Sequence, residues 1–164
     1  MNKQDIQLLY KYNQWANERI LNAASRLTSE QFLAEAEYPH GGLRGTLTHI
    51  LFAEWIWRKR ARGDSPTIRL APEDFPTFGS LRARWQAEGI ELLAFIDSVT
   101  DEQLSATFQY KSTKGDPYEN VLWQILAHVV NHGTQHRSEA AAILTEFGHS
   151  PGDIDLIVFL RNPL

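Results

Sequence analysis

Apolar side chains recur at helical spacing in four long segments of this chain, which has 164 residues. Over residues 4–24 the apolar positions are three, four or seven residues apart, so they share one face of a helix: Ile6, Leu9, Ala16, Ile20 and Ala24. The same spacing predicts helices over about residues 43–62, 80–96 and 121–147. Four long amphipathic helices indicate an all-α fold, a four-helix bundle.

The connections between these segments predict smaller elements. Thr28 followed by Gln31 has the form of a capping box and predicts a short helical turn. A strand over residues 107–110 and a turn at 114–116 predict a small β-hairpin or extended segment before the last long helix. The stretch "GDSPTIRLAPEDFPTFGS" is long for a loop and predicts a functional segment or lid, and the tail "DIDLIVFL" predicts a short helix or strand. With no repeat or linker in between, residues 1–164 are expected to form a single domain.

The second long helix carries apolar side chains on two sides. Ile50 and Trp57 lie on one face, while Phe52 and Trp55 lie nearly opposite. Such a helix is either enclosed in the core or shares one face with a partner chain. Because Phe52, Trp55 and Ile56 exceed what one core-facing stripe requires, the pattern predicts a homodimer.

Charge and composition exclude several classes of function. A net charge of −4 argues against nucleic-acid binding, and we interpret the basic run "WRKRAR" as complementing the negative end of the second long helix. The absence of cysteine excludes disulfides, Cys-based metal sites and a cysteine nucleophile. No signal peptide or membrane-spanning run is evident, so we expect a cytoplasmic protein without a membrane partner.

The segment "HVVNHGTQH" places three histidines four residues apart within the last long helix. Taking the apolar stripe around Val129 as the inward direction, His136 lies about 20° from its centre and His132 about 60°, but His128 about 100°. Helical phase therefore predicts that His132 and His136 face inward, as a pair able to share one metal ion.

A third ligand is expected, because catalytic metal sites commonly use three protein ligands and leave one position open. His49 lies among apolar residues of the second long helix and is the candidate; a core histidine bonded to a backbone carbonyl is the alternative. His40 and His149 are expected to be peripheral. Glutamate is missing from "HGTQH", which argues against a zincin, and the only Glu-x-x-His spacings, which a di-iron bundle would need, are interrupted by Pro39 and Gly148.

Four segments together resemble the DinB-like family of four-helix metalloenzymes: "YNQWANERIL", "LRGTLTHILFAEWIW", "HVVNHGTQHR" and "DIDLIVFLR". The resemblance runs along nearly the whole chain. It implies one divalent metal ion, usually zinc or nickel, held by His49, His132 and His136. The chain departs from the family's common pattern at Ser138-Glu139, where Gly-Gln is frequent, and at Gly42, where a Ser-type cap is usual.

The resemblance also suggests an activity, because understood relatives include S-transferases that use low-molecular-weight thiols. A metal-bound thiol is deprotonated, so a metal-dependent enzyme of this kind would need a thiol and an electrophilic small molecule but no cysteine of its own. Glu54, Tyr110, Asn131, Gln135 and Arg137 are candidates for orienting or binding. The alternatives are a hydrolase that uses metal-bound water and, from another class, a non-catalytic metal-binding dimeric bundle.

Overall fold

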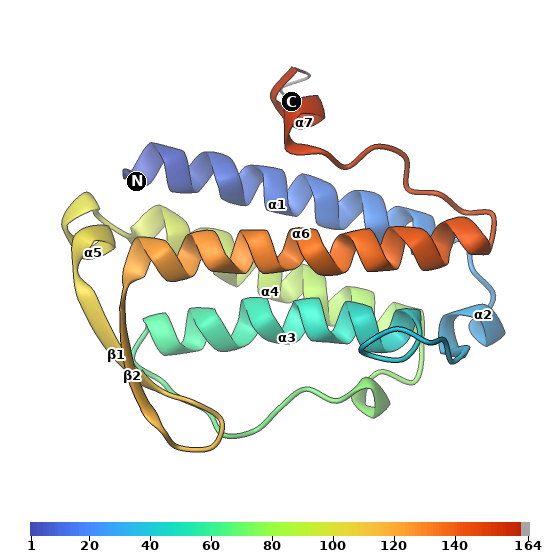
Figure 1. Ribbon diagram of the computed structural model, residues 1–164, viewed down its shortest axis with the longest axis horizontal. Helices are drawn as coiled ribbons and strands as arrows, with labels where there is room; N and C mark the ends of the chain where they lie inside the picture. The colour runs from blue at the N-terminus through green and yellow to red at the C-terminus, as the bar shows by residue number, and fades with distance from the viewer. Residues whose placement is uncertain (162–164) are drawn as a thin grey trace.

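The protein is a bundle of four long helices in the computed structural model, which describes residues 1–161 (Figure 1). The long helices are α1 (Lys3–Ala24), α3 (Leu43–Ala61), α4 (Phe78–Ser98) and α6 (Leu122–Glu146). Both α1 and α3 pack against α4 and against α6, and the buried apolar side chains form two hydrophobic clusters inside the bundle. The predicted bundle is confirmed, with every helix end within two residues of its expected place.

Shorter elements connect or follow the long helices. They are α2 (Ser29–Leu33), the 3-10 helix η1 (Pro72–Asp74), α5 (Asp101–Ser105), β1 (Thr107–Lys111), β2 (Pro117–Val121) and α7 (Leu156–Arg161). The strands form an antiparallel hairpin that leads into α6 (Figure 1), which confirms the predicted hairpin. The capping box at Thr28 is confirmed as well. The short helix α5 was not predicted, although Thr100 and Gln103 form the same kind of capping box.

The two-sided apolar pattern of the second long helix is accounted for within one chain. Trp55 and Ile56 are buried, because α3 packs against both α4 and α6. Phe52 is half-buried and lines a cavity. The two-sided apolar pattern therefore no longer supports a homodimer, and the homodimer stays a prediction. No helix in the described part of the chain combines the length and the apolar character needed to cross a membrane.

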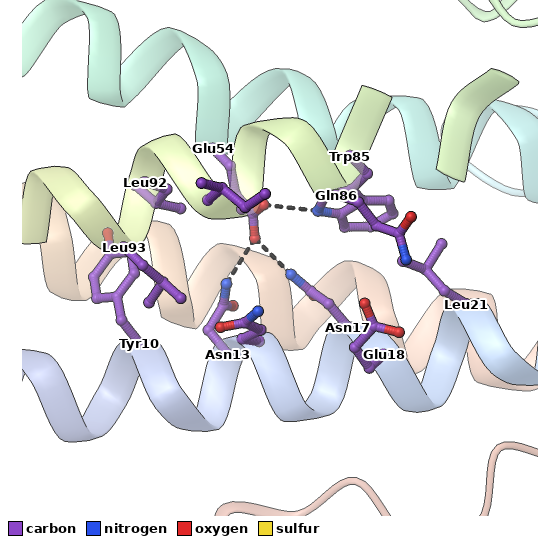
Figure 2. Close-up of a pocket in the computed structure, with 13 residues that line it drawn as sticks. Tyr10, Asn13, Asn17, Glu18, Leu21, Glu54, Trp85, Gln86, Leu92 and Leu93 are labelled. Carbon is purple, nitrogen blue, oxygen red and sulfur yellow. Dashed lines mark hydrogen bonds between the residues drawn. The ribbon is translucent and has the colours of Figure 1, made fainter. Parts of the chain in front are cut away.

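A buried polar network connects all four long helices. Glu54 of α3 accepts hydrogen bonds from Asn13 and Asn17 of α1, at 2.6 and 2.8 Å, and from the indole of Trp85 in α4, at 2.8 Å (Figure 2). Nη1 of Arg137 in α6 donates to the amide oxygens of the same two asparagines, at 2.6 and 2.9 Å. Each asparagine thus bridges a buried carboxylate and a buried guanidinium, which together cost far less than either charge buried alone.

Because Gly133 has no side chain, Arg137 and Asn13 of this network can lie close to its backbone. A Cβ atom at Gly133 would lie 2.7 Å from Nη1 of Arg137 and 3.1 Å from Oδ1 of Asn13. Arg137 is fully buried and held by three hydrogen bonds, so its guanidinium has little room to move away. The glycine in the middle of α6 is therefore explained by packing, not by chain flexibility.

Replacing Gly133 by Ala is expected to lower the free energy of unfolding by about 1–3 kcal/mol, the usual cost of overpacking a core. Gly89→Ala in α4 is the matched control, because a Cβ there meets no atom within 4 Å. The control is expected to stabilise the protein by about 0.5–1 kcal/mol through the higher helix propensity of alanine. Urea denaturation measures both. Equal stabilisation by the two substitutions would show that Arg137 does not constrain position 133.

Candidate metal centre

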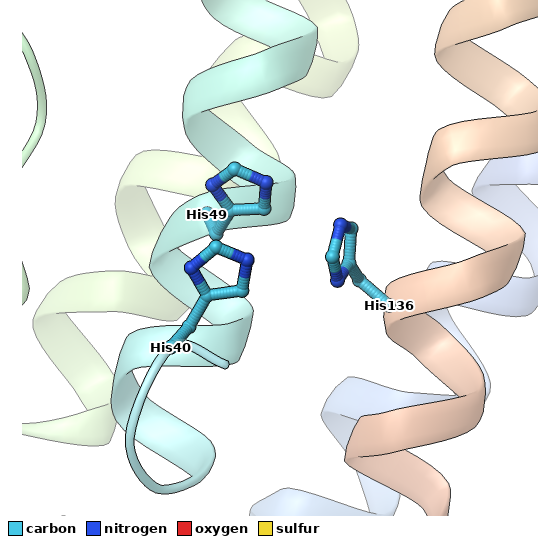
Figure 3. A group of neighbouring side chains, drawn as sticks. All are labelled: His40, His49 and His136. Carbon is cyan, nitrogen blue, oxygen red and sulfur yellow. The ribbon is translucent and has the colours of Figure 1, made fainter. Parts of the chain in front are cut away.

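Four histidine side chains meet between α3, α6 and the loop that precedes α3. His49 comes from α3, His132 and His136 from α6, and His40 from the loop. The imidazole of His40 stacks on that of His49 with ring centroids 3.7 Å apart, and His136 faces this pair from α6 (Figure 3). One ring nitrogen from each of His40, His49 and His136 can be chosen so that all three lie within 4.8 Å of one another.

The structure brings the three predicted ligands into contact. Nε2 of His49 and Nε2 of His132 lie 3.0 Å apart, and the His136 ring centroid lies 4.6 Å from that of His49 and 4.5 Å from that of His132. Ligand nitrogens about 2.0–2.1 Å from one ion are separated by roughly 3 Å, so the His49–His132 spacing suits a shared metal. Which of the four histidines bind metal stays a prediction.

His40 is not peripheral, and that expectation was wrong. Two glycines allow the loop to reach the cluster: a Cβ atom at Gly45 would lie 1.8 Å from the carbonyl oxygen of His40, and one at Gly42 would lie 1.9 Å from that of Ala34. The spacing Gly42-x-x-Gly45 at the start of a helix was the available signal for such a close approach. His149 follows the end of α6, where its N–H bonds to the carbonyl of Leu144.

Glu139 orients the ring of His136. Its Oε2 lies 2.8 Å from Nδ1 of His136, one turn further along α6. A carboxylate that accepts the Nδ1 proton fixes the tautomer and leaves Nε2 free to bind a metal. The residue at which this chain departs from the common family pattern therefore supplies the carboxylate partner that metal-binding histidines usually have.

The cluster has the chemistry of a metal site. Burial, together with neighbouring imidazoles, lowers the pKa of His49 to about 3 and that of His132 to about 4, and burial also lowers the pKa of His40. These rings are therefore neutral near pH 7, as coordination requires. In addition, Nδ1 of His132 is buried without a hydrogen-bond partner. That nitrogen is not the Nε2 atom that faces His49, so the fit to a divalent transition metal rests on the neutral imidazoles and their facing ring nitrogens.

The histidine cluster opens onto a cavity of about 360 Å³. His40, His49 and His132 line one end of it. The remaining lining comes from α3, from the loop between α3 and α4, and from the hairpin turn: Gly45, Thr48, Phe52, Ala53, Ile56, Trp57, Arg60, Arg69, Leu70, Pro72 and Thr113. The long loop that was predicted to be functional thus forms one wall.

The other candidate residues take different places. Glu54 and Arg137 belong to the buried network, and Asn131 and Gln135 are exposed. Tyr110 packs against Trp57, with ring centroids 5.0 Å apart, and donates a hydrogen bond to Asn120.

His128 is exposed at the edge of α6, as its helical phase predicts. Its ring lies against Trp57, with centroids 5.8 Å apart. The nearest of the four clustered histidines on its own helix is His132, with ring centroids 5.6 Å apart.

The metal-free protein should lose stability as the pH falls from about 6.5 towards 4. An imidazole in the unfolded chain has a pKa near 6.5, whereas the pKa values of His49 and His132 are about 3 and 4 in the folded protein. Between these values the unfolded chain takes up protons that the folded protein excludes, so the free energy of unfolding decreases. Urea denaturation with a chelator at pH 7, 6 and 5 measures this decrease. The double variant His49→Gln/His132→Gln should show a smaller one, and an unchanged pH dependence in that variant would contradict the assignment.

Comparison with known proteins agrees with this architecture. The family model described as the DinB family matches residues 1–162. A curated relative, Protein DinB of Bacillus subtilis (strain 168), is 26% identical over 168 aligned positions, which cover 94% of each chain. The match includes all four long helices and every histidine of the cluster, and the chain belongs to the DinB family.

Proposed function

We propose that this protein is a divalent-metal-dependent enzyme that joins a low-molecular-weight thiol to an electrophilic small molecule. The observation that carries the proposal is a cluster of neutral imidazoles that opens onto a cavity whose described lining contains no carboxylate. Membership of the DinB family supports it. Zinc or nickel suits a site of imidazole ligands.

In this proposal His49, His132 and His136 hold the metal, and Glu139 keeps the His136 ring in position. A bound divalent metal lowers the pKa of a coordinated thiol, which becomes a nucleophile near neutral pH. In a transfer, a carbon–sulfur bond forms, the bond from that carbon to the leaving group breaks, and the leaving group takes the electron pair. The thiol proton passes to solvent. The apolar side chains of Phe52 and Ile56 exclude water from the path of the electrophile.

The two alternatives have less support. A hydrolase would profit from a carboxylate facing the metal as a general base, but the nearest acidic side chain described here, Glu139, is bonded to Nδ1 of His136. A non-catalytic dimeric bundle would need no cavity beside the metal. A thiol-transfer assay distinguishes both from the proposed enzyme.

Single His→Gln variants test the ligand set. His49→Gln, His132→Gln and His136→Gln should each lose stoichiometric metal, since each removes one of three protein ligands. His128→Gln, whose ring lies outside the cluster, is the matched control and should stay loaded. Elemental analysis of untagged protein measures metal content, and circular dichroism checks the fold. If His40→Gln empties the site while His132→Gln stays loaded, the ligands are His40, His49 and His136 instead.

A metal titration that measures affinity tests the role of Glu139. Glu139→Gln should still bind metal, but about 10 to 100 times more weakly, because the ring of His136 loses its charged hydrogen-bond partner. Unchanged affinity would show that this contact does not tune the site.

Thiol transfer can be tested with monochlorobimane, which becomes fluorescent when a thiol displaces its chloride. We expect turnover with at least one small thiol in the zinc- or nickel-loaded protein, its loss on chelation and its recovery on adding metal back. His136→Gln should react at the uncatalysed rate, and His128→Gln should resemble the parent. Metal-loaded protein that hydrolyses activated esters but shows no thiol transfer with any of a panel of thiols would favour the hydrolase.

A further inference from the structure

Arg60 is a buried cation without a counter-charge. Its side chain lies near the end of α3 and the residue is 7% exposed, yet within residues 1–161 it forms no hydrogen bond or ion pair, and its Nε atom is buried without a partner. Of the other two buried arginines, Arg58 pairs with Glu88 at 2.9 Å. Arg137 donates hydrogen bonds to the network asparagines, although its Nε atom is also buried without a partner, so Arg60 alone among the three has no polar partner for its guanidinium within residues 1–161. An unpaired buried charge is costly, so a position that retains one calls for an explanation.

The contacts of Arg60 leave its hydrogen-bond donors available. Cζ of its guanidinium lies 4.8 Å from the ring centroid of Trp57 and 5.4 Å from that of Tyr110. Cation–π contacts of this kind use the face of the guanidinium. The N–H groups lie in its plane and point outward, in the fork that binds a carboxylate or a phosphate through two parallel hydrogen bonds.

Arg60 lines the same cavity as the histidines. It follows His49 by 11 residues in α3, which places the two on the same helix face and about 16 Å apart along the axis. Arg69 lines the cavity too, and its Nη2 donates a hydrogen bond to the hydroxyl of Thr113 at 3.0 Å. The described lining contains two arginines and no Asp or Glu. The cavity therefore has the histidines at one end, Phe52 and Ile56 in the middle and Arg60 at the other end. Arg69 lies close enough to both His49 and Arg60 for its charge to lower the pKa of each.

We propose that Arg60, assisted by Arg69, binds an anionic group of an elongated substrate whose reacting atom lies at the histidines. The group is a carboxylate or a phosphate, because both match the planar fork of arginine. This inference rests on the proposed function for the identity of the reacting end, but not for the anion site itself. It predicts that the thiol or the electrophile carries negative charge at the end remote from the reacting atom.

A structural role for Arg60 is the competing explanation. In that case the guanidinium only fills the space between Trp57 and the hairpin residue Tyr110, and no anion binds it. The two explanations differ in what happens at the Nε–H group of Arg60 when an anion is added, which can be measured without any enzymatic turnover.

Arginine Nε–H resonances of ¹⁵N-labelled protein provide that measurement. Succinate and inorganic phosphate are titrated separately at constant ionic strength, once with the zinc-loaded protein and once with the His49→Gln variant. The Arg60 resonance, assigned by its absence in Arg60→Gln, should shift and saturate in both proteins, because the anion binds at Arg60 and not at the metal. A tighter response to succinate would identify a carboxylate as the preferred group, and a tighter response to phosphate would identify a phosphate.

Substitutions of three arginines test whether anion binding depends on Arg60. Arg60→Gln should weaken anion binding, followed through the remaining arginine resonances and by calorimetry, at least tenfold, and Arg69→Gln should weaken it several-fold. Arg62→Gln is the matched control, because Arg62 is an exposed arginine at the end of the same helix and should leave binding unchanged. If Arg60→Gln does not fold, Arg69→Gln and the shift of the Arg60 resonance in the parent still decide. An Arg60 resonance that responds to neither anion overturns the proposal. Saturable shifts in a protein that shows no thiol transfer would uphold the anion site and reject the proposed reaction.

Discussion

The arrangement of the four long helices depends on one buried charge pair that is never in direct contact. Glu54 and Arg137 are joined through Asn13 and Asn17, whose amide N–H groups face the carboxylate and whose oxygens face the guanidinium. Removing one charged member would leave the other uncompensated in the core, at a cost of about 3–5 kcal/mol. A rotation of α1, α3 or α6 about its own axis would break several of these bonds at once. The network therefore fixes how each of these helices is rotated about its own axis, as well as how the helices pack together.

The geometry of the histidine cluster depends on this network. His136 directly precedes Arg137, and His49 lies five residues before Glu54 in α3. Fixing the directions of Glu54 and Arg137 therefore also fixes which way the neighbouring histidines point, towards the gap between α3 and α6. The same helices thus place charges on one side and neutral imidazoles on the other. Burial and the neighbouring imidazoles keep His49 and His132 neutral, because together they outweigh the opposing effect of Glu139 on the pKa of His132.

The lining of the cavity is also uneven in charge. Its described lining contains imidazoles, apolar side chains and arginines, but no carboxylate. Such a lining favours neutral or anionic ligands and offers no carboxylate as a proton acceptor. The loop between α3 and α4 contributes Arg69, Leu70 and Pro72 to this wall, so the specificity of the cavity is carried partly by a segment outside the bundle.

Much of the fold was encoded in local patterns. The spacing of apolar residues predicted the four helices, and the four-residue spacing of His132 and His136 in "HGTQH" predicted an inward-facing pair, because helical periodicity depends only on neighbours along the chain. The resemblance to the DinB family supplied His49, which helical phase alone left open as a core histidine. These predictions needed no knowledge of how the helices pack.

The tertiary structure decided the places of long or loop-borne polar side chains. His40 was expected to be peripheral, and its true place could not be predicted from periodicity. Its position depends on how the loop folds back over Gly42 and Gly45, which is a contact between segments. The basic run at the end of α3 was interpreted only as complementing the negative end of the helix, yet Arg58 is also buried against Glu88 of α4 and Arg60 beside Tyr110 of the hairpin. A flexible polar side chain can point to solvent or fold inward from the same backbone position, and only partners distant in sequence select one of the two.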